Sequence, residues 1–422
     1  MELNGTGYLP RLADGLLTAR LAAIGAVAIE GVKGCGKTAT ARRVAASEVL
    51  LDVDPQALQA VGIDPRLILD GATPRLIDEW QRAPAIWDAV RRAVDDRGRP
   101  GQFILTGSAT PTDTAARHSG AGRFSVLTMR TMTLPEKGAT VSTVSVGDLL
   151  RGDPIEPSRS DLAFADYLDH IVTGGWPQLI GASTDAARTF LEGYLDIIVD
   201  HDIAEISGGR RNPRLVRRFL HAYAQLTAHP AHLSTILARA DDTAGDPGGA
   251  PSRSAAEPYL DALRRMMIVD EIPAWDPSLR SSSRLTATPK RMLADPSLAA
   301  ALLDASTGRL ARDLHTLGFL FEALVAHDLR IHAEAAGGRC YHYREREGRL
   351  EVDYVIETPA GDWAAFEVKL GAAAVDDAAR SLLRLAERVF RPPAALAVVT
   401  AGAYAYTRDD GVAVIPLGCL GP

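Results

Sequence analysis

A glycine-rich loop close to the N-terminus constrains the fold of this chain more than any other part of its sequence. Residues 31–38 read Gly-Val-Lys-Gly-Cys-Gly-Lys-Thr and fit the pattern G-x-x-x-x-G-K-[ST]. The loop follows an apolar run (AVAIE) and opens a helical run (TATARRVAA), which is the strand–loop–helix context that the pattern requires. Glycines there let successive backbone N–H groups turn toward phosphate oxygens. The sequence therefore predicts a phosphate-binding loop after a buried strand.

The polar residues of this loop indicate ATP and Mg²⁺ as its ligands. Lys37 is expected to reach the β- and γ-phosphates, and the Thr38 hydroxyl to ligate Mg²⁺. A chance match in a glycine-rich segment is the alternative, and the flanking strand and helix weigh against it. The residues predicted to bind the nucleotide are Gly31, Val32, Lys33, Gly34, Cys35, Gly36, Lys37, Thr38 and Ala39.

A short apolar run that ends in two carboxylates supplies the acidic partner that such a loop needs. Residues 75–80 read Arg-Leu-Ile-Asp-Glu-Trp. Asp78, at the strand end, is predicted to hold the Mg²⁺ shell, and Glu79 to polarise the attacking water. An Asp-Glu pair by itself is usually a solvated turn, but its place after an apolar run downstream of the loop favours the functional reading.

Two further segments downstream, a strand-like run and an arginine, contain residues that suit ATP hydrolysis. The run Phe-Ile-Leu-Thr-Gly-Ser at 103–108 predicts a strand that ends in hydroxyl residues. In ring-forming ATPases a polar residue there senses the γ-phosphate, and we favour Ser108, with Thr106 close behind. Arg123 is a candidate arginine finger that reaches a neighbouring subunit's nucleotide. The alternative for any single arginine in this chain is a surface residue.

The ordered set of motifs resembles one known family. Tyr8-x-x-Arg11, GVKGCGKT, LIDEWQ, LTGS, AGR and then Gly-Gly-Trp-Pro at 174–177 are similar to bacterial and archaeal AAA-type ATPases. Those proteins carry a C-terminal domain of unknown function that looks like a restriction-endonuclease fold, and their middle segment is similar to a winged helix. The resemblance covers nearly the whole chain. Cys35 departs from the family, which often has a valine or a small residue there.

The alternation of apolar and helical runs in the sequence and this resemblance together predict an α/β protein of several domains. Apolar runs alternate with helical stretches in the first third, which favours a parallel sheet covered by helices. Strands are expected at Gly25–Ile29, Glu48–Asp52, Arg75–Ile77 and Gln102–Leu105. The predicted regions are 1–150, a P-loop AAA-type ATPase domain; 151–211, a helical linker or lid; 212–294, a winged-helix-like module; and 295–422, an endonuclease-like α/β domain.

Four residues in the last region form a second candidate site. Asp353 lies within an apolar strand, and Glu367 and Lys369 share one face of the next strand because side chains alternate. The pattern resembles the D…ExK core of PD-(D/E)xK nucleases, which implies that Asp353 and Glu367 hold Mg²⁺ and that Lys369 orients the attacking water. Glu322, in an apolar helix, fits the further metal-binding carboxylate of such folds. A solvated charge pair and a domain that has lost catalysis are the alternatives.

Lysine is scarce in this chain, which draws attention to the few positions where it occurs. Only five of the 46 basic residues are lysines, so arginine is the default cation. Lys33, Lys37 and Lys369 fall in the two candidate sites, where a planar guanidinium replaces a compact ammonium poorly. Lys137 and Lys290 have no predicted role.

The charge pattern neither demands nor forbids contact with DNA. A net charge of −7 excludes a generally basic coat. Basic residues gather at the start of one predicted helix, and the helix in Pro251–Arg265 is a possible recognition helix; a solvated helical face is the equal alternative. The clustered arginines are Arg210, Arg211, Arg214, Arg217 and Arg218.

Three scattered cysteines and the absence of a signal peptide or a long apolar run predict a cytoplasmic location without membrane contact. The leading hypothesis is a Mg²⁺-dependent ATPase that associates with DNA and carries a candidate metal-dependent nuclease. The alternative is a nucleotide-controlled switch whose C-terminal domain recognises DNA or a protein partner without cutting. Whether the chain acts as a monomer or a homo-oligomer is left open.

Overall fold

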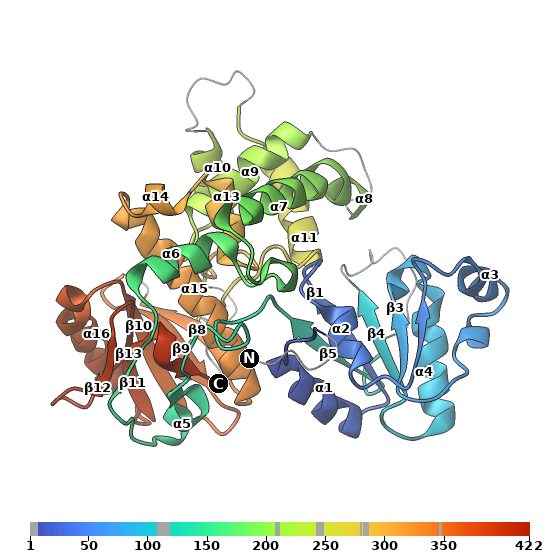
Figure 1. Cartoon of the computed structure of the whole chain (residues 1–422), viewed down its shortest axis with the longest axis horizontal. Coiled ribbons are helices and arrows are strands. Elements are labelled where there is room, and N and C mark those ends of the chain that lie inside the picture. Colours follow the sequence, from blue (N-terminus) through green and yellow to red (C-terminus); the bar gives the residue numbers. More distant parts are fainter. Residues whose placement is uncertain are drawn as a thin grey trace.

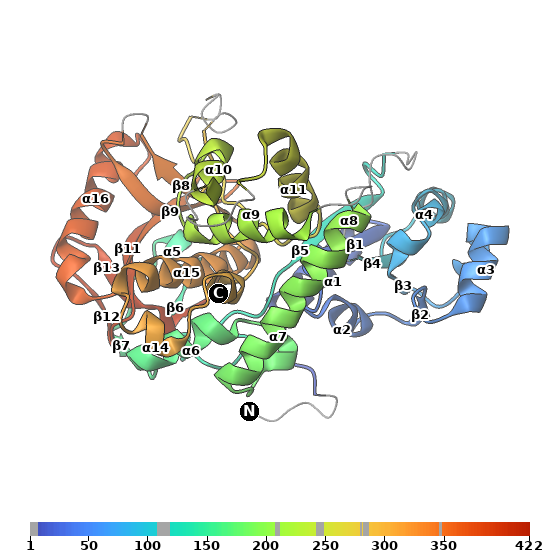
Figure 2. The ribbon, with the colours of Figure 1, turned by 90° about the horizontal axis from the view of Figure 1, so that it is seen from above.

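Two sheets flank a region of helices in this molecule. The computed structural model describes residues 7–107, 119–206, 212–241, 249–278, 281, 287–345 and 348–422. The first sheet (blue to cyan) and the second (red) lie on opposite sides of the helices (green to yellow), in the front view and from above (Figures 1 and 2). The mixed α/β class predicted from the sequence is confirmed.

The first sheet consists of five parallel strands in the order β2-β3-β4-β1-β5. These strands are β1 (Ala26–Gly31), β2 (Ser47–Leu50), β3 (Arg75–Asp78), β4 (Phe103–Gly107) and β5 (Phe124–Met129). Helices α1 (Leu12–Ala23) and α2 (Lys37–Arg42) pack on one face, and α3 (Pro55–Ile63) and α4 (Ala85–Arg97) on the other. The predicted parallel sheet is confirmed. The sequence did not reveal β5, an edge strand whose side chains are mostly part-exposed.

The middle region is helical. Its longer helices are α6 (Phe164–Thr173), α7 (Thr184–Ile197), α9 (Pro213–Gln225), α10 (Leu233–Asp241), α11 (Arg253–Arg265) and α13 (Pro296–Leu302), and its short ones α8 (Ile203–Ile206) and α14 (Thr307–Leu310). After α11 the chain forms isolated bridges, among them an antiparallel one between Ile272 and Lys290. The winged-helix assignment of this segment stays a prediction.

The second sheet is mixed and has the order β7-β12-β13-β11-β10-β9-β8. Strand β10 is parallel to β11 and antiparallel to β9. Helix α15 (Leu314–Ala335) packs on one face of the sheet and α16 (Val375–Arg388) on the other. The strands after α15 are β8 (Arg339–Arg344), β9 (Glu351–Glu357), β10 (Trp363–Lys369), β11 (Ala395–Thr400), β12 (Tyr404–Thr407) and β13 (Ala413–Pro416).

The segment that follows the first sheet pairs with the C-terminal region, both in a small two-stranded sheet and at the edge of the second sheet. Strand β6 (Val144–Ser145) pairs with β14 (Leu420–Gly421), and β7 (Ser158–Arg159) pairs with β12. Between them, α5 (Val146–Arg151) packs against α15. One apolar cluster also runs from the α1 face of the first sheet through the helices to the α15 face of the second. The three regions are therefore packed together, while the predicted domain boundaries remain predictions.

Candidate functional site

The glycine-rich loop connects the end of β1 to the start of α2, as its motif predicts. Gly34 (φ 79°) and Gly36 (φ 102°) have left-handed backbone conformations, which favour glycine because it has no Cβ. A Cβ on Gly31 would lie 2.1 Å from the carbonyl oxygen of Met129 on β5. The backbone path of the loop therefore favours glycine at these three positions, independently of any ligand.

The two lysines of the loop have different environments. Lys37 is buried, and its Nζ donates to the carbonyl oxygens of Gly31 (2.9 Å) and Val32 (3.0 Å), so the ammonium lies inside the loop. Lys33 is half-exposed and forms an ion pair of 2.8 Å with Asp202 of the helical region. Lys37 is thus the lysine that faces the place predicted for phosphate, and Lys33 ties the loop to the helices.

Side chains from helix α2 and strand β4 meet at the carboxylate of Asp78, which lies at the end of β3. Its Oδ1 accepts a hydrogen bond of 2.9 Å from the Thr38 hydroxyl and another from the Thr106 hydroxyl on β4. Within the described part of the chain, Asp78 forms no ion pair. Carboxylate and hydroxyl oxygens are hard ligands of the kind that Mg²⁺ prefers, so this donor set fits that ion. Ser108, the other predicted sensor, lies outside the described residues.

Glu79 lies directly after Asp78 in a strained conformation. Its φ is 52°, in the left-handed region that a residue with a Cβ rarely adopts. The carboxylate is half-buried and accepts a hydrogen bond from the Gln81 amide. Burial raises the pKa of Glu79 above its usual range, while the Gln81 hydrogen bond and the charge of Lys37 act in the opposite direction. A carboxylate of this kind can accept a proton from a nearby water.

Arg123 lies far from its own chain's loop. It precedes β5 at the end of the parallel sheet opposite the loop, and its Nε forms an ion pair of 2.7 Å with Asp95 of α4. It therefore does not contribute to the loop of its own chain. A role in a neighbouring subunit stays a prediction.

Several residues without a predicted role hold the loop from outside. The Arg11 guanidinium donates to the Cys35 carbonyl oxygen (2.8 Å). The Trp176 ring and the Gln178 amide lie 3.7 and 3.4 Å from the place that a Cβ on Gly34 would take. Tyr194 donates to the Lys33 carbonyl oxygen (3.2 Å). Arg11 and Trp176 belong to motifs that the sequence displays, but only the fold shows what they contact.

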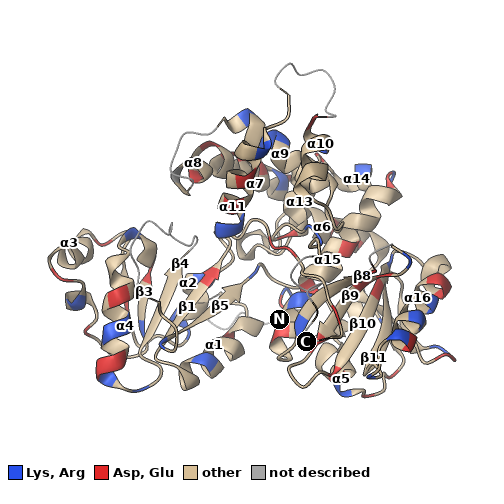
Figure 3. Cartoon of the chain, turned by 180° about the vertical axis from the view of Figure 1, so that it is seen from behind, with Lys and Arg blue, Asp and Glu red and all other residues tan. Residues whose placement is uncertain are grey.

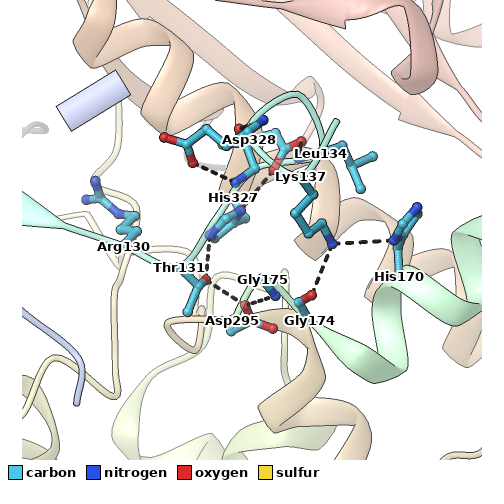
Figure 4. A network of polar contacts seen from close by, with 12 residues as sticks. Arg130, Thr131, Leu134, Lys137, His170, Gly174, Gly175, Asp295, His327 and Asp328 are labelled. Carbon is cyan, nitrogen blue, oxygen red and sulfur yellow. Dashed lines mark hydrogen bonds and ion pairs between the residues drawn. The ribbon is translucent and has the colours of Figure 1, made fainter. Parts of the chain in front are cut away.

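A buried polar network connects this contact to α15 of the C-terminal region. Figure 4 shows the part of it around Asp295, Thr131 and His327. The Trp176 indole donates to the Ser297 hydroxyl (3.1 Å), which donates to Asp295 (2.6 Å). Asp295 also accepts from the Thr131 hydroxyl (2.6 Å), and that hydroxyl lies 2.9 Å from His327 Nε2 on α15. Burial opposes ionisation of Asp295, but His327 and these hydrogen bonds outweigh it and lower its pKa. The network therefore extends from the residues around the loop to α15, the helix that also carries Glu322.

The four residues of the second candidate site meet at the end of the β9–β10 pair. Lys369 Nζ lies 2.6 Å from Glu367 and 3.5 Å from Asp353. Asp353 also accepts a hydrogen bond of 2.9 Å from the backbone N–H of Val368. Glu322 approaches the same place from α15 and accepts a hydrogen bond of 3.0 Å from the Tyr354 hydroxyl of β9. Residues far apart in sequence are thus brought together as the motif resemblance suggested.

A fifth residue, Lys290, lies among these carboxylates. Its side chain is 1% exposed, and its Nζ lies 2.6 Å from Glu322 Oε1 and 3.5 Å from Asp353 Oδ1. Burial and the neighbouring Asp353 raise the pKa of Glu322 to about 7 and that of Glu367 to about 8. Burial also opposes ionisation of Asp353, but Lys290 and Lys369 outweigh it and lower its pKa. The scarcity of lysine had marked Lys290 as unusual without showing its partners.

The residues of this second cluster do not fit a bound metal ion as they stand. Ammonium groups contact all three carboxylates that the resemblance assigns to metal. Over the described ranges, no three or more His, Cys, Asp or Glu side chains are arranged to hold a metal. The predicted role of Glu322, Asp353 and Glu367 as metal ligands therefore stays a prediction that Lys290 opposes.

Comparison with known families gives a clear result for the first sheet. Residues 24–137 match the AAA domain family. This part of the chain is therefore similar to AAA domains. Residues 164–309 and 317–420 match two domains of unknown function, DUF8612 and DUF4143. The AAA domain includes the loop, Asp78 and Glu79, whereas the endonuclease-like fold of the C-terminal region is not shown.

The relatives of the chain add little about its role. Two mycobacterial proteins, Mb2031c of Mycobacterium bovis and Rv2008c of Mycobacterium tuberculosis, are both uncharacterized; each is 27% identical over 399 residues, which are 92% of this chain and 79% of the relative. The Walker-type ATPase PABY2304 of Pyrococcus abyssi (14% identity, TM-score 0.40, 70% of this chain and 96% of that one) and Drosophila ORC bound to DNA (14%, 0.17, 72% and 85%) are likenesses too distant to carry an argument.

The arginines predicted to contact DNA are partly engaged with acidic residues. Arg217 forms ion pairs with Asp196 (2.7 Å) and Asp200 (3.3 Å), and Arg264 forms one with Glu271 (2.7 Å). Figure 3 shows basic residues on α9 and acidic residues on α7, the helix that carries Asp196. Arg210 and Arg211 lie outside the described residues. DNA contact therefore stays a prediction.

The helices of the described ranges were also compared with the length and apolarity that a membrane span needs. None of them is long and apolar enough to cross a bilayer.

Proposed function

We propose that this protein binds ATP with Mg²⁺ at residues 31–38 and hydrolyses it. The observation that carries the proposal is the convergence of three elements on Asp78, which accepts hydroxyl donors from Thr38 of the loop and Thr106 of β4. The match of residues 24–137 to the AAA domain family supports the same conclusion. Asp78 and Thr38 are the protein residues that would hold the metal ion.

The residues of the loop have separate roles in this reaction. Lys37 would exchange the carbonyl oxygens of Gly31 and Val32 for the β- and γ-phosphate oxygens, which satisfy its donors equally well. Glu79 would orient a water molecule and accept its proton, which the raised pKa of this carboxyl favours. Bound Mg²⁺ would neutralise negative charge on the phosphate oxygens.

The test of ATP hydrolysis compares loop variants with a surface variant. In Lys37→Ala, kcat/KM for ATP is expected to fall on the order of 10²-fold or more, because the variant loses a preorganised charge at the phosphates. Glu79→Gln is expected to lower kcat with little change in ATP affinity. Arg66→Ala, which removes an exposed ion pair with Asp64, is the surface control. Undiminished turnover by Lys37→Ala would refute the assignment.

We also propose that the C-terminal region responds to the nucleotide without cutting DNA. The path from Gly34 through Trp176, Ser297 and Asp295 to α15 supports this role as a binding switch for DNA or a protein partner. Phosphodiester cleavage is the competing proposal, which the convergence of Asp353, Glu367 and Lys369 supports and the contacts of Lys290 oppose.

A nuclease assay with supercoiled and single-stranded DNA in Mg²⁺ or Mn²⁺, with and without ATP, separates the two proposals. The switch predicts no cleavage by the purified chain, together with DNA or partner binding that changes between ATP and ADP. Cleavage that Lys369→Ala abolishes would establish the competing proposal.

A further inference from the structure

The position of Lys290 is fixed by its backbone. Its N–H donates to the Ile272 carbonyl oxygen (2.9 Å), and the Ile272 N–H donates back (3.0 Å). Lys290 also forms a bridge with Pro230, and the next residue, Arg291, donates its N–H to the His229 carbonyl oxygen (2.9 Å). Because neighbouring segments hold this backbone on both sides, the side chain starts from a rigid base and not from a free loop.

The ammonium group is surrounded by groups that suit a cation. In addition to its ion pairs with Glu322 and Asp353, Nζ donates to the Asp353 carbonyl oxygen (3.3 Å) and lies 4.7 Å from the centre of the Tyr354 ring. A carboxylate, a carbonyl oxygen and the face of an aromatic ring all stabilise positive charge. The side chain is 1% exposed, so water does not compete for these contacts.

Distance and charge argue against a metal ion in the same place. A Mg²⁺ ion binds oxygen at about 2.1 Å, so an ion on Glu322 Oε1 would lie within about 5 Å of an ammonium that is itself 2.6 Å from that oxygen. The cluster holds three carboxyl groups and two ammonium groups, which leaves at most one excess negative charge to attract a divalent ion. An ion there would also meet the repulsion of both lysines in a poorly hydrated site.

We propose that Lys290 is the built-in cation of the C-terminal acidic cluster and closes this cluster to divalent metal ions. The residues of the D…ExK pattern then form an ion network that joins the helical region to the second sheet. Removal of the ammonium would free Glu322 and Asp353 to move together with Glu367 around a metal ion. This proposal does not depend on ATP hydrolysis.

The experiment measures Mn²⁺ binding by electron paramagnetic resonance on the full chain without nucleotide. Asp78→Asn is the common background, because it removes the carboxylate of the loop. In this background we expect no Mn²⁺ at the cluster. Adding Lys290→Met is expected to create a single site that binds Mn²⁺ at least about tenfold more tightly than the background, as freed carboxylates become available. Lys290→Arg, which keeps the charge, is the matched control and is expected to create none.

A third substitution assigns the new site. Adding Asp353→Asn to the Lys290→Met chain is expected to abolish the gained binding. A Lys290→Met chain that gains no site would overturn the proposal, and so would a gained site that survives Asp353→Asn.

A second measurement does not require the Lys290→Met chain to fold. The Asp78→Asn chain is compared with the Asp78→Asn/Asp353→Asn chain, and equal Mn²⁺ binding is the expected result. A Mn²⁺ site that is present in the first chain and lost in the second would show that Lys290 does not exclude the metal.

Discussion

The loop of the AAA domain and the C-terminal cluster both combine lysine with acidic residues, but they differ in what holds each charge. At the loop, Lys37 donates to backbone carbonyl oxygens and Asp78 accepts from hydroxyl groups. At the cluster, Lys290 and Lys369 donate directly to carboxylates. A carboxylate bonded to hydroxyl groups keeps its full charge for a ligand, whereas one bonded to ammonium is already neutralised. Similar residue types therefore leave the carboxylate of Asp78 without a counter-ion among the described residues, while the carboxylates of the cluster already have one.

Because the charges are held differently, substitutions at the two sites should have different effects on activity and on stability. Removing one partner of a buried ion pair leaves an uncompensated charge and costs about 3–5 kcal/mol. The cluster carries such pairs, because Lys290 is 1% exposed and Glu322 13% exposed. At the loop, the groups that bind Lys37 are neutral. Substitutions at the loop should thus affect turnover, and substitutions at the cluster should affect folding.

The largest effect is expected at Asp78. In Asp78→Asn, ATP turnover should fall on the order of 10³-fold or more, because the Mg²⁺ shell loses its carboxylate while both hydroxyl donors keep an oxygen acceptor. A coupled ATPase assay and a denaturant titration measure the two quantities. The free energy of unfolding should change by less than about 1 kcal/mol. A chain that keeps its turnover, or that unfolds, would remove the contrast between the sites.

The second prediction concerns stability at the cluster. Lys290→Met should lower the free energy of unfolding without added metal by about 3–5 kcal/mol, because Glu322 and Asp353 lose a buried counter-ion. The chain with both Lys290→Met and Glu322→Gln should recover part of this loss. Urea titration of the two variants and the wild type gives the comparison. A loss below about 1 kcal/mol would mean that this buried pair contributes no more to stability than an exposed ion pair does.

The third prediction is a dependence of stability on pH. The pKa of Glu367 rises from its usual 4.5 to about 8 in the folded chain, so the folded state binds more protons than the unfolded state between these values. Its contribution is therefore present in full below about pH 4.5 and is lost as the pH rises through about 8. Glu367→Gln should remove roughly 3–4 kcal/mol of this decline between pH 5 and pH 8. An unchanged pH profile in urea titrations would contradict the assignment.

The smallest effect is expected on the polar path from Trp176 to α15. Trp176→Phe keeps the ring against Gly34 but removes the indole donor to Ser297, so the free energy of unfolding should fall by about 1 kcal/mol. Ser297→Ala also removes the donor to Asp295. A double-mutant cycle on ATP affinity then measures the coupling energy. Strictly additive effects on ATP affinity would mean that this hydrogen bond does not communicate with the loop.

Much of the first site was readable from the sequence because its signals are local. The loop motif, the apolar run before Asp78 and the strand before Thr106 each lie within a few residues, and four strands of the sheet were predicted from such runs. Strand β5 was missed because its side chains are mostly part-exposed and carry no clear apolar pattern. Lys290 had no predicted partner because Glu322 and Asp353 lie 32 and 63 positions later.

The sequence by itself determined the glycine-rich loop, the parallel sheet around it and the four residues of the second candidate site, because short-range periodicity and turn chemistry encode them. Only the tertiary structure decided which partner each acid receives. The partners come from segments that fold side by side: Thr106 on the strand next to β3, and Lys290 on a backbone bridged to Ile272. Charge compensation acts through space, and that placement separates an acid bonded to hydroxyl groups from acids paired with ammonium groups.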